Sequence, residues 1–155
     1  IDQKGEVVTN GTLKGKIFVT DFFFTSCPSI CPVMAKQMLR IHDAYIDNDQ
    51  ILFLSHSIDP TRDSIQTLNN YADKIGILTN AKWHFVRGEK EAIAAMAEDY
   101  MIVAYEDDEV PGGFEHSGYF ILVDGAQHVR GYYDGTSQHD VTKLIADIEV
   151  LLNER

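Results

Sequence analysis

Cysteine and positive charge are both scarce in this sequence. Its 155 residues include two cysteines, too few to indicate whether the protein works in an oxidising or a reducing compartment. Lysine and arginine number 13 against 24 aspartates and glutamates, and the resulting net charge of −11 disfavours non-specific binding to nucleic acid. No apolar run approaches the roughly 18 to 20 residues that a membrane-spanning helix needs, because Asp21 interrupts even the run 17–24. Internal repeats and low-complexity segments are absent as well.

The chain is nevertheless long enough to form a substantial core. A length of 155 residues is typical of one domain, and the composition is that of an ordinary globular protein. We therefore expect a single domain over residues 1–155.

Both cysteines lie in one short stretch, Thr-Ser-Cys-Pro-Ser-Ile-Cys-Pro at 25–32. The apolar, β-branched and aromatic run before it predicts a buried strand, and the helical spacing of apolar residues after it predicts a helix that begins at Pro32. Cys31 would then lie at a helix N-terminus, where the helix dipole favours a thiolate. A thiolate there can be a redox nucleophile or a soft metal ligand; an inert disulfide or two buried thiols are the alternatives.

The remaining pattern predicts an α/β fold. Strands alternate with helices and the chain ends in a hairpin and a helix, so we expect a partly parallel sheet that is covered on both faces. Ligands of such sheets bind beyond the carboxyl ends of the strands, where the cysteine stretch is expected. The predicted elements are a hairpin within 1–16, strands at 17–24, 51–54, 83–86, 101–105, 119–123 and 129–133, and helices at 32–47, 61–75, 88–100 and 141–152.

Two of the six histidines are candidates for a third ligand. His116 ends a Pro-Gly-Gly loop and precedes a core strand, and His56 ends the second strand, at the same sheet edge as the cysteines. His42, beside Asp43 in the first helix, is expected at the surface. Two thiolates and one imidazole would suit copper(I) and tolerate copper(II), whereas a structural zinc site would normally have a fourth protein ligand.

Three motifs together resemble the Sco/SenC family, whose members assist assembly of the copper A centre of cytochrome c oxidase. They are the run Phe-Thr-Ser-Cys-Pro-Ser-Ile-Cys-Pro at 24–32, the run Ser-Ile-Asp-Pro-Thr-Arg-Asp at 57–63, and His116-Ser117 ahead of an apolar strand that ends at Asp124-Gly125. They occur in family order and at family spacing, and the likeness extends from about residue 13 to residue 152.

The resemblance implies a thioredoxin-like fold of the peroxiredoxin type, with three layers, a central mixed sheet and an N-terminal β-hairpin. It also implies a copper site formed by Cys27, Cys31 and His116. Thioredoxin-like oxidoreductases usually have C-x-x-C and a proline before the facing strand; here the spacing is C-x-x-x-C and a histidine takes that place, which favours metal binding. Ser29 stands where an acidic residue is common in the family.

We therefore expect a copper chaperone that delivers copper to the copper A domain of oxidase subunit II or to another copper chaperone. The alternatives are a thiol–disulfide reductase that uses Cys27 and Cys31 as its redox-active pair, and a copper or redox sensor. A structural role is expected for Asp59, Arg62 and Asp63 at the start of a helix. The resemblance also implies an N-terminal membrane anchor that would hold the domain on the periplasmic side of a bacterial inner membrane, or in the mitochondrial intermembrane space.

Overall fold

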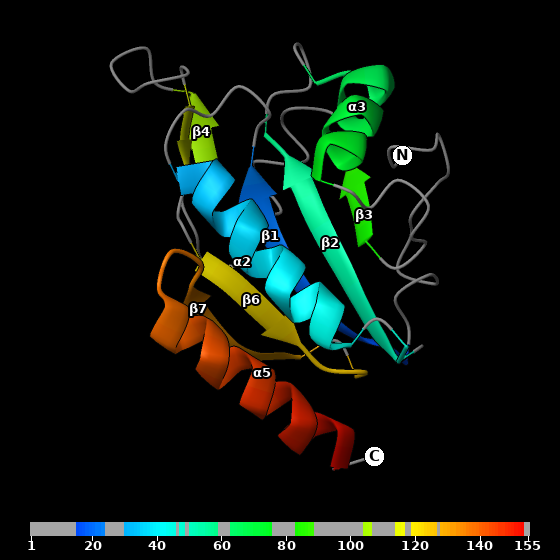
Figure 1. Ribbon diagram of the computed structural model, residues 1–155, viewed down its shortest axis with the longest axis vertical. Helices are drawn as coiled ribbons and strands as arrows, with labels where there is room; N and C mark the ends of the chain where they lie inside the picture. The colour runs from blue at the N-terminus through cyan, green and yellow to red at the C-terminus, as the bar shows by residue number, and fades with distance from the viewer. Residues whose placement is uncertain are drawn as a thin grey trace.

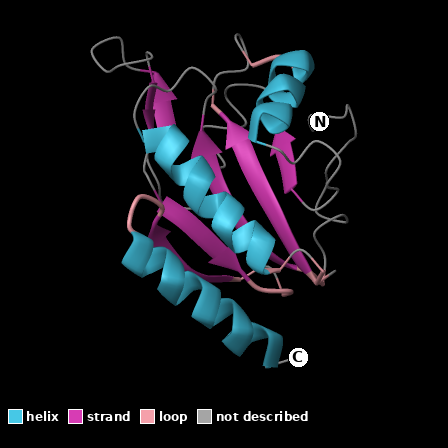
Figure 2. Cartoon of the chain, viewed as in Figure 1, coloured by secondary structure: helices cyan, strands magenta, loops and turns pink. Residues whose placement is uncertain are grey.

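The computed structural model has a five-stranded mixed sheet at its centre, with strand order β3-β2-β1-β6-β7 (Figures 1 and 2). A separate two-stranded sheet pairs β4 with β5. The residues that the structure describes are 15–23, 30–45, 47–48, 50–58, 63–75, 83–88, 104–106, 114–116, 119–126 and 128–153. Among these, the structure describes only the backbone of 30–32, 104–106 and 114–116.

Three parallel strands form one half of the central sheet. They are β1 (Ile17–Phe23), β2 (Ile51–Ser57) and β3 (Trp83–Val86). All seven residues of β1 are buried, as expected of a strand with neighbours on both sides. The sequence predicted β1 and β3 closely, but β2 is three residues longer than the predicted 51–54 and therefore includes His56.

The three helices that the structure describes lie on one face of this sheet. The ring of His42, on α2 (Ile30–Ala44), contacts Phe53 and Trp83. The ring of Tyr71, on α3 (Ile65–Ile75), contacts Phe23 and Phe85. These four ring partners share one sheet face because side chains alternate along a strand, and we call it the helix-covered face.

The third helix, α5 (Gln138–Asn153), packs beside α2 on the same face (Figure 1). The Arg40 guanidinium on α2 donates to the carbonyl of Gln138 and to the hydroxyl of Thr142. One turn further along, the Tyr45 hydroxyl donates to the Ile145 carbonyl at 2.8 Å. These contacts fix the position of α2, the helix that begins next to the cysteine stretch.

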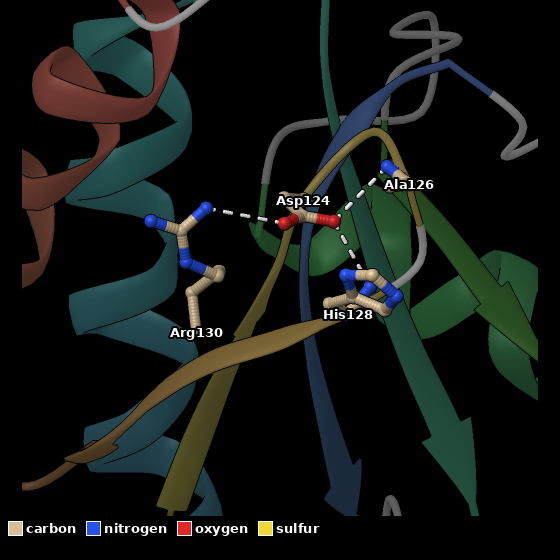
Figure 3. A network of polar contacts seen from close by, with 4 residues as sticks. All are labelled: Asp124, Ala126, His128 and Arg130. Atoms are coloured by element: carbon tan, nitrogen blue, oxygen red, sulfur yellow. Dashed lines mark hydrogen bonds and ion pairs between the residues drawn. The ribbon is translucent and has the colours of Figure 1, made fainter.

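The antiparallel half of the sheet is the hairpin of β6 (Tyr119–Val123) and β7 (Val129–Asp134), which the sequence predicted. Asp124 organises the turn: its carboxylate accepts from the amides of Ala126 and His128 and from the Arg130 guanidinium (Figure 3). Partial burial of this carboxyl opposes ionisation, but those three donors outweigh it and lower the pKa of Asp124. The turn holds β7 in register with β6.

A second small sheet consists of β4 (Ala104–Glu106) and β5 (Phe114–His116), paired antiparallel. The sequence predicted a strand at 101–105, close to β4, but no strand at 114–116. In Figure 1, β4 and its partner lie toward the same end of the long axis as the carboxyl ends of β1 and β2. The predicted N-terminal hairpin within 1–16 and the predicted helix 88–100 lie outside the described residues apart from 15–16 and 88.

Two predicted helix starts were wrong. Helix α2 begins at Ile30, so Pro32 is its third residue rather than its first. Helix α3 begins at Ile65, and Ser64 caps it by accepting from the Thr67 amide at 3.1 Å. The sequence had assigned that opening to Thr61 and Asp63. Asp63 instead lies buried outside the helix, where its carboxylate accepts from the Ser57 hydroxyl at 2.6 Å.

Candidate metal site at the carboxyl edge of the sheet

Cys31 is the second residue of α2, which confirms that it lies at a helix N-terminus. The amides of a first helical turn have no partner within the helix, and the positive end of the helix dipole adds to their field. No acidic residue lies in the first turn of α2 to oppose that field. A backbone position of this kind favours the thiolate form of a cysteine, the form that binds soft metals and attacks disulfides. Cys27 lies in 24–29, outside the described residues.

His116 is the last residue of β5, opposite Ala104 of β4. It therefore lies on a short strand rather than in the loop that the sequence suggested. The β4–β5 sheet and the first turn of α2 both lie toward the end of the long axis at which β1 and β2 finish (Figure 1). The predicted set of Cys27, Cys31 and His116 remains a prediction, since the side chains of these three residues are outside the described part of the chain.

His56 reaches the same sheet edge but is directed into the protein. It is the last residue but one of β2, aligned with Phe22 of β1, and is 4% exposed. Its ring stacks on Phe22 with centroids 4.9 Å apart, and neither ring nitrogen has a hydrogen-bond partner among the described residues. Burial lowers the pKa of His56 to about 4, so its imidazole is neutral at physiological pH.

The expectation that His42 lies at the surface was wrong. The side chain is 2% exposed and packs between α2 and the aromatic rings of the helix-covered face. Its Nδ1 contacts Asp43 at 3.1 Å, and its Nε2 has no hydrogen-bond partner in the described part of the chain. Position could have signalled this, because His42 is next to Ile41 and four residues after Met38, both fully buried.

Sequence reasoning also missed a buried polar network that joins β1, β2 and β3. The Ser55 hydroxyl donates to the Asp21 carboxylate at 2.5 Å and accepts from the Trp83 indole at 3.1 Å. Asp21 is 5% exposed, so this carboxylate depends on such donors for its solvation. The available signal was Asp21 itself, the single charge in an otherwise apolar run.

Within the described ranges, no group of three or more His, Cys, Asp or Glu side chains could hold a metal ion. The side chains of Cys27, Cys31 and His116 are not among the described ones. The helices described here are also too short or too polar to cross a bilayer.

Comparison with known proteins gives a family match over almost the whole chain. The family model described as SCO1/SenC matches residues 1–153. This match includes all three motifs that carried the resemblance in the sequence.

Curated relatives agree with the family model. The chain is 27% identical over 150 residues to a SCO1 protein homolog of Bacillus subtilis, covering 96% of this chain and 77% of the relative. It is 26% identical over 159 residues to a putative copper-binding protein of Stutzerimonas stutzeri, covering 100% of this chain and 76% of that protein.

Solved structures are similar in fold. A SCO1/SenC family lipoprotein of Bacillus anthracis superposes with a TM-score of 0.88 at 27% identity, covering 97% of this chain and 90% of that one. BsSco is described with a disulfide switch and as a member of the Sco family of cytochrome c oxidase assembly proteins. It superposes with a TM-score of 0.84 at 26% identity, covering 99% of this chain and 90% of that one. Copper-bound ScoI of Arabidopsis thaliana superposes with a TM-score of 0.81 at 24% identity, covering 100% of this chain and 95% of that one, and this likeness shows the fold alone. The fold of the present chain is thioredoxin-like, as predicted.

Proposed function

This chain belongs to the SCO1/SenC family, and from that premise we propose that it binds one copper ion through Cys27, Cys31 and His116 and delivers it to the copper A centre of cytochrome c oxidase. The observation that carries the proposal is the family match over residues 1–153, with Cys31 in the first turn of a helix. Two relatives support it by name: one is a putative copper-binding protein, and the other belongs to a family of cytochrome c oxidase assembly proteins.

The proposed ligand set suits a cargo that must be both held and released. Two thiolates and a neutral imidazole form a soft, low-coordinate set that copper(I) accepts readily. Such a set leaves room for an incoming ligand, so that the cysteines of an acceptor can displace these ligands one at a time. Cys31 would be held by α2, whereas His116 lies on the short β5. We infer that the helix supplies the fixed ligand and the short strand the ligand that moves.

A thiol–disulfide reductase is the second candidate, favoured by the disulfide switch described for BsSco. One thiolate of the pair Cys27 and Cys31 would attack a substrate disulfide to give a mixed disulfide, and the other would resolve it. The products would be a Cys27–Cys31 disulfide and two substrate thiols. No metal takes part in this reaction, so His116 would be dispensable or would only adjust a thiol pKa.

We further propose that the domain is held at a membrane surface, on the periplasmic side of a bacterial inner membrane or in the mitochondrial intermembrane space, through an N-terminal anchor. The Bacillus anthracis relative supports a surface attachment, because it is described as a lipoprotein. Copper A assembly on subunit II would require such a location.

Anaerobic titration of the fully reduced protein with copper(I), in competition with a copper(I) chelator, tests the proposal. We expect one equivalent to bind tightly to the wild type and at least about tenfold more weakly to His116→Ala, because a ligand is lost. His128→Ala is the matched control, since His128 is exposed in the β6–β7 turn. Equal binding by wild type and His116→Ala, together with fast disulfide exchange that needs both cysteines, would instead identify a reductase.

A further inference from the structure

A groove runs along the exposed side of α2, the helix that begins at the cysteine stretch. It has a volume of about 940 Å³, within the usual size range of ligand pockets. Its first lining residue, Val33, is two residues beyond Cys31 and is 44% exposed. The groove, which we call the α2 groove, is lined by Val33, Lys36, Gln37, Leu39, Arg40, Asp43 and Gln138.

The charge of the α2 groove is opposite to that of the protein as a whole. Lys36 is exposed on its wall, and Arg40 is fixed beside it by hydrogen bonds to Gln37 and to two groups of α5. Asp43, the acid among the lining residues, is at the far end and contacts His42. The end of the groove next to Cys31 is therefore cationic and partly apolar, on a chain with a net charge of −11.

The geometry points to the α2 groove as the docking site for an acidic segment, with apolar side chains between its carboxylates, of the protein that exchanges metal at the cysteine stretch. This inference rests on the proposed function. Carboxylates would pair with Lys36 and Arg40, and apolar side chains would cover Val33 and Leu39. Because the rest of the chain repels an acidic partner, that partner would dock in this groove. Docking there would orient the partner's metal-binding residues toward Cys31.

Binding is tested on the metal-free protein, so the result does not depend on copper chemistry. The probe is a short synthetic peptide of alternating glutamate and leucine, titrated into isotope-labelled protein and followed by amide chemical shifts. We expect shifts concentrated at Val33, Lys36 and Arg40, and binding about fivefold weaker for Lys36→Glu at low salt, with the difference lost near 1 M salt. Lys143→Glu is the control, because Lys143 is an exposed cation of α5 outside the groove.

Equal weakening by Lys36→Glu and Lys143→Glu would overturn the inference, because it would reflect net charge alone. Shifts outside the α2 groove, no binding, or equal binding of a lysine–leucine peptide would overturn it too. Failure of the copper(I) titration with binding in the groove would refute the proposed function and leave the docking site standing. Tight copper(I) binding by the wild type, weakened in His116→Ala, without binding of the peptide in the α2 groove would refute the docking site alone.

Discussion

At the scale of single residues, the chemistry of this domain is concentrated where polar groups lie inside the core. Asp21 and Asp63 are buried, and each accepts from the hydroxyl of a β2 serine. His56 has no such partner within the described ranges, although it is equally buried. A buried polar group without a partner lowers stability. His56 is therefore the residue at which a substitution is most informative.

The burial of His56 predicts that the protein loses stability in mild acid. Its folded pKa of about 4 lies below the ordinary value of 6.5, so its contribution is intact above pH 6.5 and is lost as the pH falls toward 4. Between pH 7.5 and 5 we expect this histidine alone to lower the free energy of unfolding by about 2 kcal/mol. Urea denaturation at both pH values, with wild type and His56→Leu, measures it.

The variant should lose about 2 kcal/mol less than the wild type over that range. His139→Leu is the matched control, because His139 is a histidine exposed on α5. A His56→Leu protein with the full wild-type dependence would contradict the assignment.

At the scale of elements, the sequence predicted the strands better than the ends of the helices. Residues 83–86 and 119–123 were predicted without error because β-branched and aromatic runs are bounded by clear turn signals. Helix starts were missed because several capping residues compete within a few positions. From the sequence, Thr61, Asp63 and Ser64 could each cap α3. Only tertiary packing determines that the Asp63 carboxylate instead accepts a hydrogen bond from Ser57.

Ser64 should therefore account for the capping energy of α3. Ser64→Ala removes the acceptor for the Thr67 amide and should lower the free energy of unfolding by about 1 kcal/mol. Ser64→Asp keeps an acceptor in place and should stay close to the wild type. Thermal or urea denaturation of the three proteins decides it; an alanine variant as stable as the wild type would show that the cap is not needed.

A substitution at Gly131 should lower the stability of the β6–β7 hairpin. A Cβ at this position would lie 2.8 Å from the Tyr133 hydroxyl oxygen, and that hydroxyl is held by Asp147 at 2.5 Å. Gly131→Ala should therefore displace the ring and cost about 1 to 2 kcal/mol in urea denaturation. In a Tyr133→Leu background the same substitution should cost clearly less; an equal cost in both backgrounds would exclude contact with this ring as the cause.

At the scale of the whole molecule, fold and family could be read from the sequence because motif order and spacing constrain the topology. The site could be read only as far as its residue names. Its proposed ligands come from separate parts of the chain, at the start of α2 and the end of β5. Neither periodicity nor propensity predicts how such distant segments meet. The burial of His42 was missed for a related reason, since it depends on the rings of β2 and β3.

Copper binding should change the dynamics of the molecule most at the β4–β5 sheet. Two short strands are only marginally stable on their own, and β4 and β5 have three residues each. If copper joins His116 to Cys31, the small sheet is tied to the first turn of α2, and local opening of its backbone must break a metal bond. We expect copper(I) to slow amide hydrogen exchange at 104–106 and 114–116 by about tenfold or more, and to change exchange within β1 and β2 much less.

The Cys31→Ser protein, loaded under the same conditions, should show little of this protection. Slow exchange in both proteins would mean that Cys31 is not the ligand that ties the small sheet to α2. Unchanged exchange in a wild type that holds one equivalent of copper would mean that His116 is not the ligand that closes the site.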